Sequence, residues 1–461
     1  MIRRYTVGFV LFLSLVYSVA FAAPKTPSDP LQQMLDQVVT HQLSNGMRWL
    51  FLEDHSAPVV TSLFWVKTGS RNERPGITGI SHLFEHMMFR GSAKYGPEEH
   101  AKLVSRHGGE CNAFTTNDGT VYYEVMPSDQ LELVIHLEAE RFANLKLDSA
   151  VLVEEKKVVS EERRQRTDND LFGAANEQLE INFYQSTTYS WPVIGWMHDI
   201  LGYSLEDVQE YYRLHYAPNN VVGIIVGDFK LEQAMKLAEK YWGKIPAQPT
   251  PPAPKMVEVP QKGERRIQFK RPAELPMLFA AYHIPPQTDP DIPALEVLSR
   301  ILSSGQSSRL YQRLVYKEQM VRFAGGAADN RIGPGQFGFW MGMKQGSNMD
   351  DAEKILWEEV ERLRTEPVTE SELMKAKNQL EAGQIGGLAS SMSRAMRLGS
   401  YENGYGDYRK LGERAAALRA VTAEDVKRVA KKYLDPDQRT VLVVVPTKDE
   451  TAMNDVEGGT R

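Results

Sequence analysis

One stretch of this 461-residue chain occurs twice, 218 residues apart, and this duplication constrains the fold more than any other feature. The segments 204–226 and 422–444 both run from a capping Ser or Thr through a helical pattern and a proline turn into an apolar strand. The matched positions are Asp207 and Asp425, Val208 and Val426, and Pro218 and Pro436. Because the register holds over about twenty positions, we predict two homologous domains.

A proline-rich stretch, 245–254, lies between the two copies. Proline lacks the amide hydrogen that a helix or a central strand needs, so this stretch predicts an extended linker. The resulting division is a signal segment over 1–22, an N-terminal domain over 23–244, a linker over 245–262, a homologous C-terminal domain over 263–447 and a flexible tail over 448–461.

Local patterns within the N-terminal domain alternate between strand and helix. They predict a strand, an Asn-Gly turn and a strand over 40–52, a third strand over 59–67, and helices over 79–89, 97–107, 130–145 and 150–166. The hairpin signals favour an α+β fold, with an antiparallel sheet flanked by helices in each domain, over a parallel barrel.

The first residues have the pattern of a secretory signal peptide. Arg3 and Arg4 precede an apolar run over 7–19, and the Ala-Phe-Ala segment 20–22 places small residues where signal peptidase reads. An uncleaved membrane anchor is the alternative, but the run is shorter than the ~20 residues of a spanning helix. We therefore expect cleavage and no membrane contact beyond this segment.

Charge and cysteine content argue against a nucleic-acid partner and exclude chemistry that needs more than one cysteine. With 54 Lys and Arg against 60 Asp and Glu, the net charge is −6, and no basic run gives a nucleic-acid partner an electrostatic footprint. Cys111 is the single cysteine, so an intrachain disulfide and a site built on several thiolates are both excluded.

The segment His82-Leu-Phe-Glu85-His86 lies in the first predicted helix. His82 and His86 are about 40° apart around a helix, so both imidazoles leave one face and can share a divalent metal, with Glu85 about 60° to the other side of His82. Apolar neighbours indicate that the helix is buried, where a metal would compensate the polar groups. The alternative is a pair of hydrogen-bonded histidines without a metal.

The helix predicted over 150–166 offers a third ligand. Its apolar stripe consists of Val151, Leu152, Val158 and Val159. Glu155 and Glu162 fall in the middle of this stripe, whereas Glu161 lies toward its margin. Because buried carboxylates need a positive partner, we expect Glu162 to bind the metal, with Glu161 as the fallback. The alternative is a solvated charge run over 161–164.

Three protein ligands leave a fourth zinc position for water, as in catalytic zinc sites. Zinc lowers the pKa of that water toward about 7, and Glu85 can take its proton, so that hydroxide attacks a polarised carbonyl. Glu155, one helical repeat before Glu162, is placed to steady the site. The pattern therefore predicts amide hydrolysis.

The second copy lacks these metal ligands. The offset of 218 residues places Arg300 and Ser304 at the positions of His82 and His86. We therefore expect one Zn²⁺ per chain.

These residues resemble the H-x-x-E-H signature of the pitrilysin/insulinase metallopeptidases, the inverzincins. The segments 108–115, 191–195 and 216–220 fit the same family, and the resemblance spans nearly the whole mature chain, most like its processing-peptidase branch. It implies that zinc is bound by His82, His86 and Glu162, that Glu85 is the general base and that Glu155 assists. It also implies two homologous domains of the LuxS/processing-peptidase type, and two such chains that enclose a chamber for unfolded peptides.

The same resemblance places Asn112 and Ala113 on an edge strand that pairs with the substrate backbone. The alternative for these two residues is a turn between a helix and a strand. Signal segment and family branch together imply a bacterial periplasm.

The resemblance fails at one point in the second half. Active double-length relatives carry an arginine and a tyrosine there, seven residues apart around a Lys-Glu-Gln segment, and the matching positions here are Val315 and Arg322. Residues of the right types nearby are Arg309, Tyr311, Arg313 and Tyr316. We hypothesise a zinc-bearing subunit of a heterodimer whose partner supplies the pair; a homodimer is the alternative.

The sequence thus predicts a zinc-dependent endopeptidase that hydrolyses peptides or unfolded segments. One rival is a non-catalytic peptide-binding or assembly subunit that retains the peptidase fold, and another is a periplasmic metal- or peptide-capture module. The joint presence of both histidines, Glu85 and Glu162 weakens the first rival, and the second would show tight metal binding without hydrolysis of any peptide.

Overall fold

The computed structural model describes residues 29–447. The predicted signal segment 1–22 and the predicted tail 448–461 lie outside the described residues. Among the helices that are described, none is long and apolar enough to cross a membrane.

The N-terminal half is built on a six-stranded sheet with strand order β1-β2-β6-β3-β5-β4. Its neighbours are antiparallel except for β2 and β6, which are parallel, and β4 is an edge strand. The strands are β1 (Val39–Gln42), β2 (Arg48–Glu53), β3 (Val59–Val66), β4 (Glu110–Thr115), β5 (Thr120–Pro127) and β6 (Val221–Gly227).

The C-terminal half repeats this arrangement in a five-stranded sheet with order β7-β11-β8-β10-β9. Here β7 and β11 form the one parallel pair, and β9 takes the edge place of β4. The strands are β7 (Arg265–Pro272), β8 (Met277–Ile284), β9 (Val321–Asp329), β10 (Gly335–Met343) and β11 (Arg439–Thr447).

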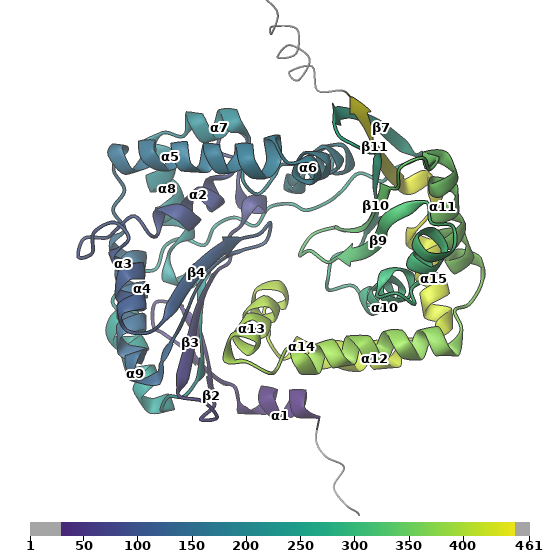
Figure 1. The fold of residues 1–461 in the computed structure, drawn as a ribbon. Coiled ribbons are helices and arrows are strands. Elements are labelled where there is room, and N and C mark those ends of the chain that lie inside the picture. The colour runs from purple at the N-terminus through teal and green to yellow at the C-terminus, as the bar shows by residue number, and fades with distance from the viewer. Residues whose placement is uncertain (1–28, 448–461) are drawn as a thin grey trace, which may run out of the picture.

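Most helices of the N-terminal half cover one face of its sheet (Figure 1). The core between them is aromatic, with Trp49, Phe64 and Trp242 in mutual ring contact. The helices of this half, apart from α6, are α1 (Pro30–Gln37), α2 (Ile80–Met87), α3 (Glu99–Arg106), α4 (Leu131–Asn144), α5 (Ser149–Arg163), α7 (Met197–Gly202), α8 (Leu205–His215) and α9 (Leu231–Trp242).

The C-terminal sheet carries its own layer of helices and a second core around Phe337 and Phe339. These helices, apart from α13, are α10 (Ile292–Ser303), α11 (Met349–Thr365), α12 (Glu370–Gly386), α14 (Lys410–Ala420) and α15 (Ala423–Tyr433). No helix or strand is formed between Trp242 and Arg265 in this structure, where the sequence predicts the linker 245–262.

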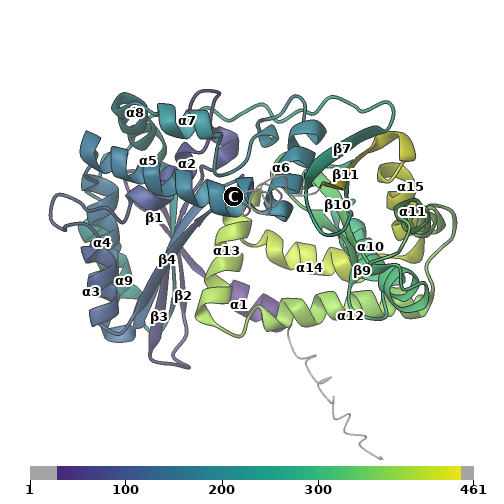
Figure 2. The same cartoon turned by 45° about the horizontal axis from the view of Figure 1, so that its top comes forward.

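The two halves exchange one helix each across the molecule (Figures 1 and 2). Helix α6 (Leu171–Phe183) packs on the C-terminal sheet, with Leu179 and Phe183 buried against β8 and β11. Helix α13 (Ser391–Tyr405) packs on the N-terminal sheet, with Ala395 and Leu398 buried against β3 and β6. The two exchanged helices overlap at the same 218-residue offset, so each sheet has a helix of the opposite half on the face that most helices of its own half leave open. On the N-terminal sheet, α1 packs on that face as well.

The predicted duplication and the α+β fold are confirmed. Strand β3 and helix α8 have counterparts at the 218-residue offset, namely β8 and α15. Each sheet is mixed rather than purely antiparallel, because β6 and β11 return from far along the chain to lie parallel to β2 and β7.

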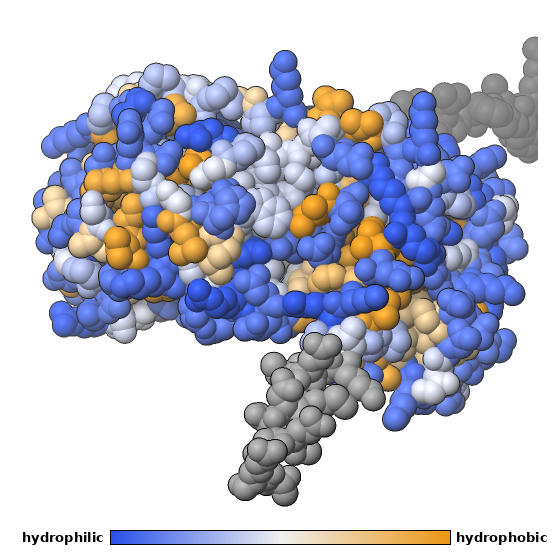
Figure 3. Space-filling model, turned by 90° about the horizontal axis from the view of Figure 1, so that it is seen from above, coloured by the Kyte–Doolittle hydropathy of each residue, from blue (hydrophilic) through white to orange (hydrophobic). Residues whose placement is uncertain are grey.

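On the face seen in Figure 3, hydrophobic side chains form small separate patches.

Candidate metal centre

Helix α2 carries the H-x-x-E-H segment, and two buried carboxylates hold its N-terminus in place. Glu73 accepts hydrogen bonds from the backbone amides of Gly79, at 2.7 Å, and Ser81, at 2.8 Å. Asp199 accepts bonds from the amide and the hydroxyl of Thr78 at 3.1 and 2.6 Å. Since the first amides of a helix have no partner within the helix, these carboxylates satisfy them and fix the position of the motif.

Two glycines let the segment before α2 approach a neighbouring loop. Gly79 has φ +86° and Gly195 has φ +85°, a region that residues with a Cβ rarely adopt. A Cβ on Gly195 would lie 2.1 Å from the Thr78 carbonyl oxygen, and one on Gly79 would lie 2.2 Å from that of Ile194. Neither position can accept a side chain unless the backbone that positions α2 shifts.

We expect Gly195→Ala to lower the free energy of unfolding by about 3 kcal/mol, because it adds both a steric clash and backbone strain. Gly202→Ala on α7 is the matched control, since a Cβ there meets nothing within 4 Å. We expect that control to change stability by less than about 1 kcal/mol. Urea denaturation of both variants measures the difference; equal stabilities would show that the contact does not constrain α2.

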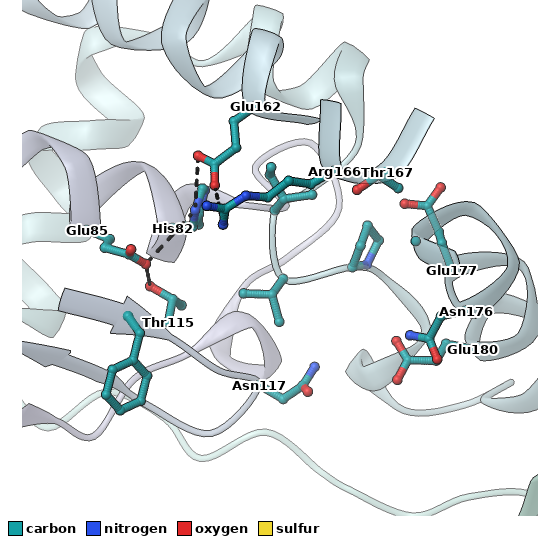
Figure 4. A pocket seen from close by; sticks show the side chains of 15 residues that line it. His82, Glu85, Thr115, Asn117, Glu162, Arg166, Thr167, Asn176, Glu177 and Glu180 are labelled. Carbon is teal, nitrogen blue, oxygen red and sulfur yellow. Dashed lines mark hydrogen bonds and ion pairs between the residues drawn. The ribbon is translucent and has the colours of Figure 1, made fainter. Parts of the chain in front are cut away.

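The structure brings His82, His86 and Glu162 together, and their ligand atoms all lie within 4.8 Å of one another. Glu162 Oε2 lies 3.1 Å from His86 Nε2 and 3.7 Å from His82 Nε2. Ligands about 2.1 Å from a tetrahedral zinc lie roughly 3.4 Å from each other, so this donor set fits the ion in both chemistry and spacing. Figure 4 shows Glu162 of α5 facing His82 of α2.

The protonation states of two ligands favour metal binding. Burial lowers the pKa of His82 to about 4, with a smaller contribution from the neighbouring His86, so its imidazole is neutral at physiological pH. The hydrogen bond from His86 lowers the pKa of Glu162, which keeps that side chain a carboxylate. Metals bind the neutral imidazole and the ionised carboxylate.

Glu85 lies beside the three ligands without joining them. Its Oε2 is 4.0 Å from His82 Nε2 and accepts a 2.7 Å hydrogen bond from the hydroxyl of Thr115 on β4 (Figure 4). Burial raises the pKa of Glu85, which makes this carboxylate a better proton acceptor than an exposed one. The group is therefore placed to exchange a proton next to the metal position.

Glu155 is 1 % exposed and lies behind His86. Its Oε2 is 3.7 Å from His86 Nδ1, and its Oε1 is 2.5 Å from Arg90 Nε. Glu155 thus contacts a candidate ligand rather than the candidate metal position, and Arg90 supplies the positive partner that its burial requires. The sequence pattern alone did not identify Arg90, although it lies one turn after His86.

The end of α5 departs from helical geometry directly after Glu162. Residues Arg164–Asp168 form a π-helical turn, a distortion that is frequent at functional sites. Arg166 in this turn lies 2.7 Å from Glu162 Oε1.

On the same helix, Val158 is 41 % exposed, so its predicted place on the buried face is wrong; Leu152, Glu155 and Val159 are buried.

A cavity of about 420 Å³ opens beside His82, Glu85 and Glu162. Its opposite wall is the exchanged helix α6, which contributes Asn176, Glu177 and Glu180 (Figure 4). Sequence reasoning missed these three residues, because nothing local indicates that α6 crosses to the other half.

Asn112 and Ala113 lie in strand β4, so the alternative of a turn at these residues is excluded. Strand β4 pairs only with β5 in the described sheet. Asn112 is exposed, and Ala113 is 9 % exposed. The free edge of β4 also carries Thr115, the hydrogen-bond partner of Glu85, so this edge runs directly to the metal centre.

Val315 and Arg322 are placed outside this site. Val315 is half-buried in the π-helical turn Tyr311–Lys317, and Arg322 is exposed on β9. The nearby Arg309 and Arg313 are both engaged, in ion pairs with Glu372 and Glu359 respectively. Tyr316 is 69 % exposed. None of these residues lines the cavity at the metal centre.

A second cluster of ligand-type residues is present in the described chain: His100, Glu124 and Glu138. All three are buried, and His100 Nε2 lies 3.2 Å from Glu124 Oε1. The guanidinium of Arg141 is bonded to Glu138 and lies 3.5 Å from Glu124, so both carboxylates already have a cation. We interpret this cluster as a structural ion-pair network.

Two family models match the chain. The model described as "Insulinase (Peptidase family M16)" matches residues 48–195, and the model described as "Peptidase M16 inactive domain" matches residues 202–380. The first match contains the whole candidate metal centre. The second begins at the end of α7 in the N-terminal half, continues through the C-terminal half and ends within α12, the counterpart of α5.

Named relatives cover nearly the full length. The chain is 29 % identical to "Zinc protease PqqE" of Helicobacter pylori over 96 % of this chain and 100 % of the relative. It is 27 % identical to "Mitochondrial-processing peptidase subunit beta" of Lentinula edodes, over 85 % and 86 % of the two chains.

Solved structures give the same result for the fold. The structure of a protease from Helicobacter pylori matches with a TM-score of 0.85 at 29 % identity, over 89 % of this chain and 99 % of that one. The periplasmic protease PqqL from Escherichia coli matches with a TM-score of 0.76 at 18 % identity, over 91 % of this chain but 48 % of the longer PqqL chain.

Proposed function

Because this chain belongs to the insulinase family of peptidases, family M16, we propose that it is a zinc-dependent endopeptidase. Its metal ligands are His82, His86 and Glu162, and Glu85 is its general base. Its substrates are peptides or unfolded segments of polypeptides.

The observation that carries this proposal is the arrangement of four side chains around one cavity. His82, His86 and Glu162 present three ligand atoms to a common point, and Glu85 lies next to it at 4.0 Å from His82 Nε2. The cavity beside them is open, as a catalytic site requires and a structural zinc site does not.

The roles of the residues follow from their contacts. Zinc, when bound, would polarise the carbonyl of the scissile bond and lower the pKa of a bound water. Glu85 takes a proton on Oε1 or Oε2 and returns it to the leaving amine, while the Thr115 hydroxyl holds its carboxylate in place. Glu155 and Arg90 orient the ring of His86 from behind.

We further propose that substrate adds to the free edge of β4 as an extended strand, with Asn112 and Ala113 in contact with its backbone. Main-chain hydrogen bonds to an edge strand hold a peptide without regard to its sequence. Because Thr115 on the same strand bonds Glu85, a peptide on this edge presents its backbone next to the metal centre.

Two observations support an active form with a second, related chain. The PqqL chain of Escherichia coli is about twice the length of the part that this chain matches, and the Lentinula edodes relative is named as a subunit. In this chain, Val315 and Arg322 stand where double-length relatives carry an arginine and a tyrosine. We propose that a partner chain supplies this pair, and that the assembly encloses a chamber.

The purified single chain is therefore expected to hydrolyse peptides weakly. Its kcat/KM should lie below roughly 10⁴ M⁻¹s⁻¹, the lower end of the usual range for enzymes. Steady-state kinetics on quenched peptides over a range of chain concentrations measure this. A value above that limit, independent of concentration, would contradict the need for a partner; a rise with concentration would identify the partner as a second copy.

The predicted signal segment 1–22 and the periplasmic relative PqqL support export to a bacterial periplasm as part of the proposal. Nothing else in the proposal depends on this location.

Hydrolysis of a mixed library of quenched peptides by zinc-loaded residues 23–461 tests the function itself. We expect weak cleavage that disappears on treatment with a chelator and returns with one equivalent of zinc. Zinc bound at one per chain with no cleavage of any peptide, alone or with a related chain added, would instead favour the non-catalytic binding or assembly subunit.

A further inference from the structure

The C-terminal half contains a cavity of about 620 Å³ at the place where the N-terminal half has its metal centre. It lies between α10 and α12, the counterparts of α2 and α5. The 218-residue offset relates four lining residues, Arg300, Ser303, Ser304 and Leu380, to His82, Glu85, His86 and Glu162 in that order. The second half thus has a hollow at the same place, with a cation, two hydroxyls and a leucine in place of the candidate metal ligands and base.

Positive charge dominates this second cavity, which we call the basic cavity. Three arginines line it, Arg300, Arg397 and Arg414, against the single carboxylate of Glu296. Glu296 is already paired with Arg414 at 2.8 Å. Two guanidinium groups on the cavity wall, those of the exposed Arg300 and the half-buried Arg397, therefore remain without an ion-pair partner in the described residues.

The contacts of those two arginines are to neutral groups. Arg300 Nη1 donates to the hydroxyl of Ser304 at 3.3 Å, and Arg397 Nη2 donates to the carbonyl of Gly383 at 2.8 Å. Within residues 29–447, neither arginine forms an ion pair. The buried hydroxyl of Ser303 has no hydrogen-bond partner in the described protein. The cavity therefore holds donors that an anion would satisfy.

A third cavity of about 340 Å³, which we call the joining cavity, lies between the basic cavity and the cavity at the metal centre and shares lining residues with both. Asn176 of α6 lines both this joining cavity and the cavity at the metal centre. Ala327 and Trp340 line both the joining cavity and the basic cavity. The three hollows therefore lie next to one another in a row across the two halves of the molecule.

The joining cavity is mostly apolar. Its walls include Phe172 and Trp340, which are 47 % and 38 % exposed, together with Leu179, Phe279 and Phe339. Large aromatic side chains left partly exposed along a hollow are typical of a surface that binds apolar groups.

We propose that this row is a binding track for the peptide substrate, and that the basic cavity holds a carboxylate of the peptide whose scissile bond lies at the metal centre. The inference rests on the proposed function, because it starts from a peptide bound at the metal. Guanidinium groups bind carboxylates through two parallel hydrogen bonds, and Arg300 and Arg397 supply such groups. The preferred substrate is then a peptide with an anionic group separated from the cleaved bond by an apolar segment.

Binding to the zinc-loaded Glu85→Gln chain tests the track without requiring turnover. The probes are three fluorescent peptides with one apolar core: one with a free C-terminal carboxylate, one amidated with a Glu side chain near that end, and one amidated with Gln in place of Glu. We expect at least one anionic peptide to bind about tenfold more tightly than the neutral one by fluorescence anisotropy. The anionic peptide that binds more tightly than the neutral one shows whether the bound carboxylate is the C-terminus or a side chain.

Arg300→Gln and Arg397→Gln, each made in the Glu85→Gln chain, are expected to remove most of this advantage. Arg213→Gln on α8 is the matched control, an exposed arginine outside all three cavities, and it should retain the advantage. A loss of the advantage in the two cavity variants also excludes a carboxylate that binds zinc directly, since such binding would survive both substitutions. Thermal melting of each variant checks that the fold is retained.

Equal binding of all three peptides, or an advantage that survives both cavity substitutions, would overturn the track. Cleavage of all three peptides by the wild-type chain is measured separately. Cleavage without any dependence on peptide charge would remove the track and leave the peptidase in place. Charge-dependent binding without cleavage would support the track and contradict the catalytic proposal.

Discussion

Glu85→Gln is expected to retain one zinc per chain and to reduce peptide hydrolysis by about 10³-fold. The side chain is not among the three ligand residues, so its replacement leaves the metal donors intact. Gln has the same shape, and its amide oxygen can still accept the hydrogen bond from Thr115. What it loses is the ability to take a proton from water and return it to the leaving amine.

The measurement pairs zinc content with hydrolysis rates for wild type, Glu85→Gln and a control, Glu154→Gln. Glu154 is an exposed residue on α5 that is paired with Lys157 outside the site, so its substitution should leave both quantities unchanged. Undiminished hydrolysis by the Glu85→Gln chain would contradict its role as general base. A loss of zinc with activity would assign Glu85 to the metal instead.

Glu162→Ala is expected to weaken zinc binding by more than about 100-fold and to abolish hydrolysis at stoichiometric zinc, because it removes one of three ligands. The neighbouring Glu161→Ala is a matched control: the same residue type, one position earlier, with its side chain 57 % exposed and paired with Arg164. Competition with a zinc-binding dye measures the affinity of both variants.

Comparing the Glu162→Ala and Glu161→Ala variants also decides which of the two glutamates predicted from the sequence binds the metal. The structure places Glu162 within 3.1 Å of His86, whereas Glu161 points to Arg164 and Gln165. Equal zinc affinity in the two variants would contradict the geometry. A larger loss for Glu161→Ala would make the sequence's fallback ligand correct.

Much of the fold could be predicted from sequence because the signals were local. The repeated capping boxes at Ser204 and Thr422 and the proline turns at Pro218 and Pro436 have physical causes within a few residues, and each appears where the pattern predicts it. Helix α2 and strand β3 follow in the same way from periodicity.

The relations between distant segments could not be predicted. Nothing in the pattern of 171–183 indicates that α6 covers the C-terminal sheet rather than its own. The parallel pairing of β2 with β6 joins segments separated by three strands and most of the N-terminal half, and no turn specifies it. Such choices are made by tertiary packing, which a local period does not encode.

The site shows the same division. Spacing on one helix predicts that His82 and His86 share a face, and the apolar stripe of the second helix predicts that Glu162 meets them. The predicted buried stripe wrongly included Val158, because α2 and α7 cover only part of that face of α5. Arg90 and α6 were missed because their roles depend on contacts between elements.

The most direct test of the account is the position of zinc in a crystal of the zinc-soaked chain, located by anomalous scattering at the zinc edge. We predict one peak per chain, bonded to Nε2 of His82, Nε2 of His86 and the carboxylate of Glu162, with Glu85 outside the coordination shell. A peak at His100, Glu124 and Glu138, or no ordered zinc at His82 and His86, would contradict the central claim.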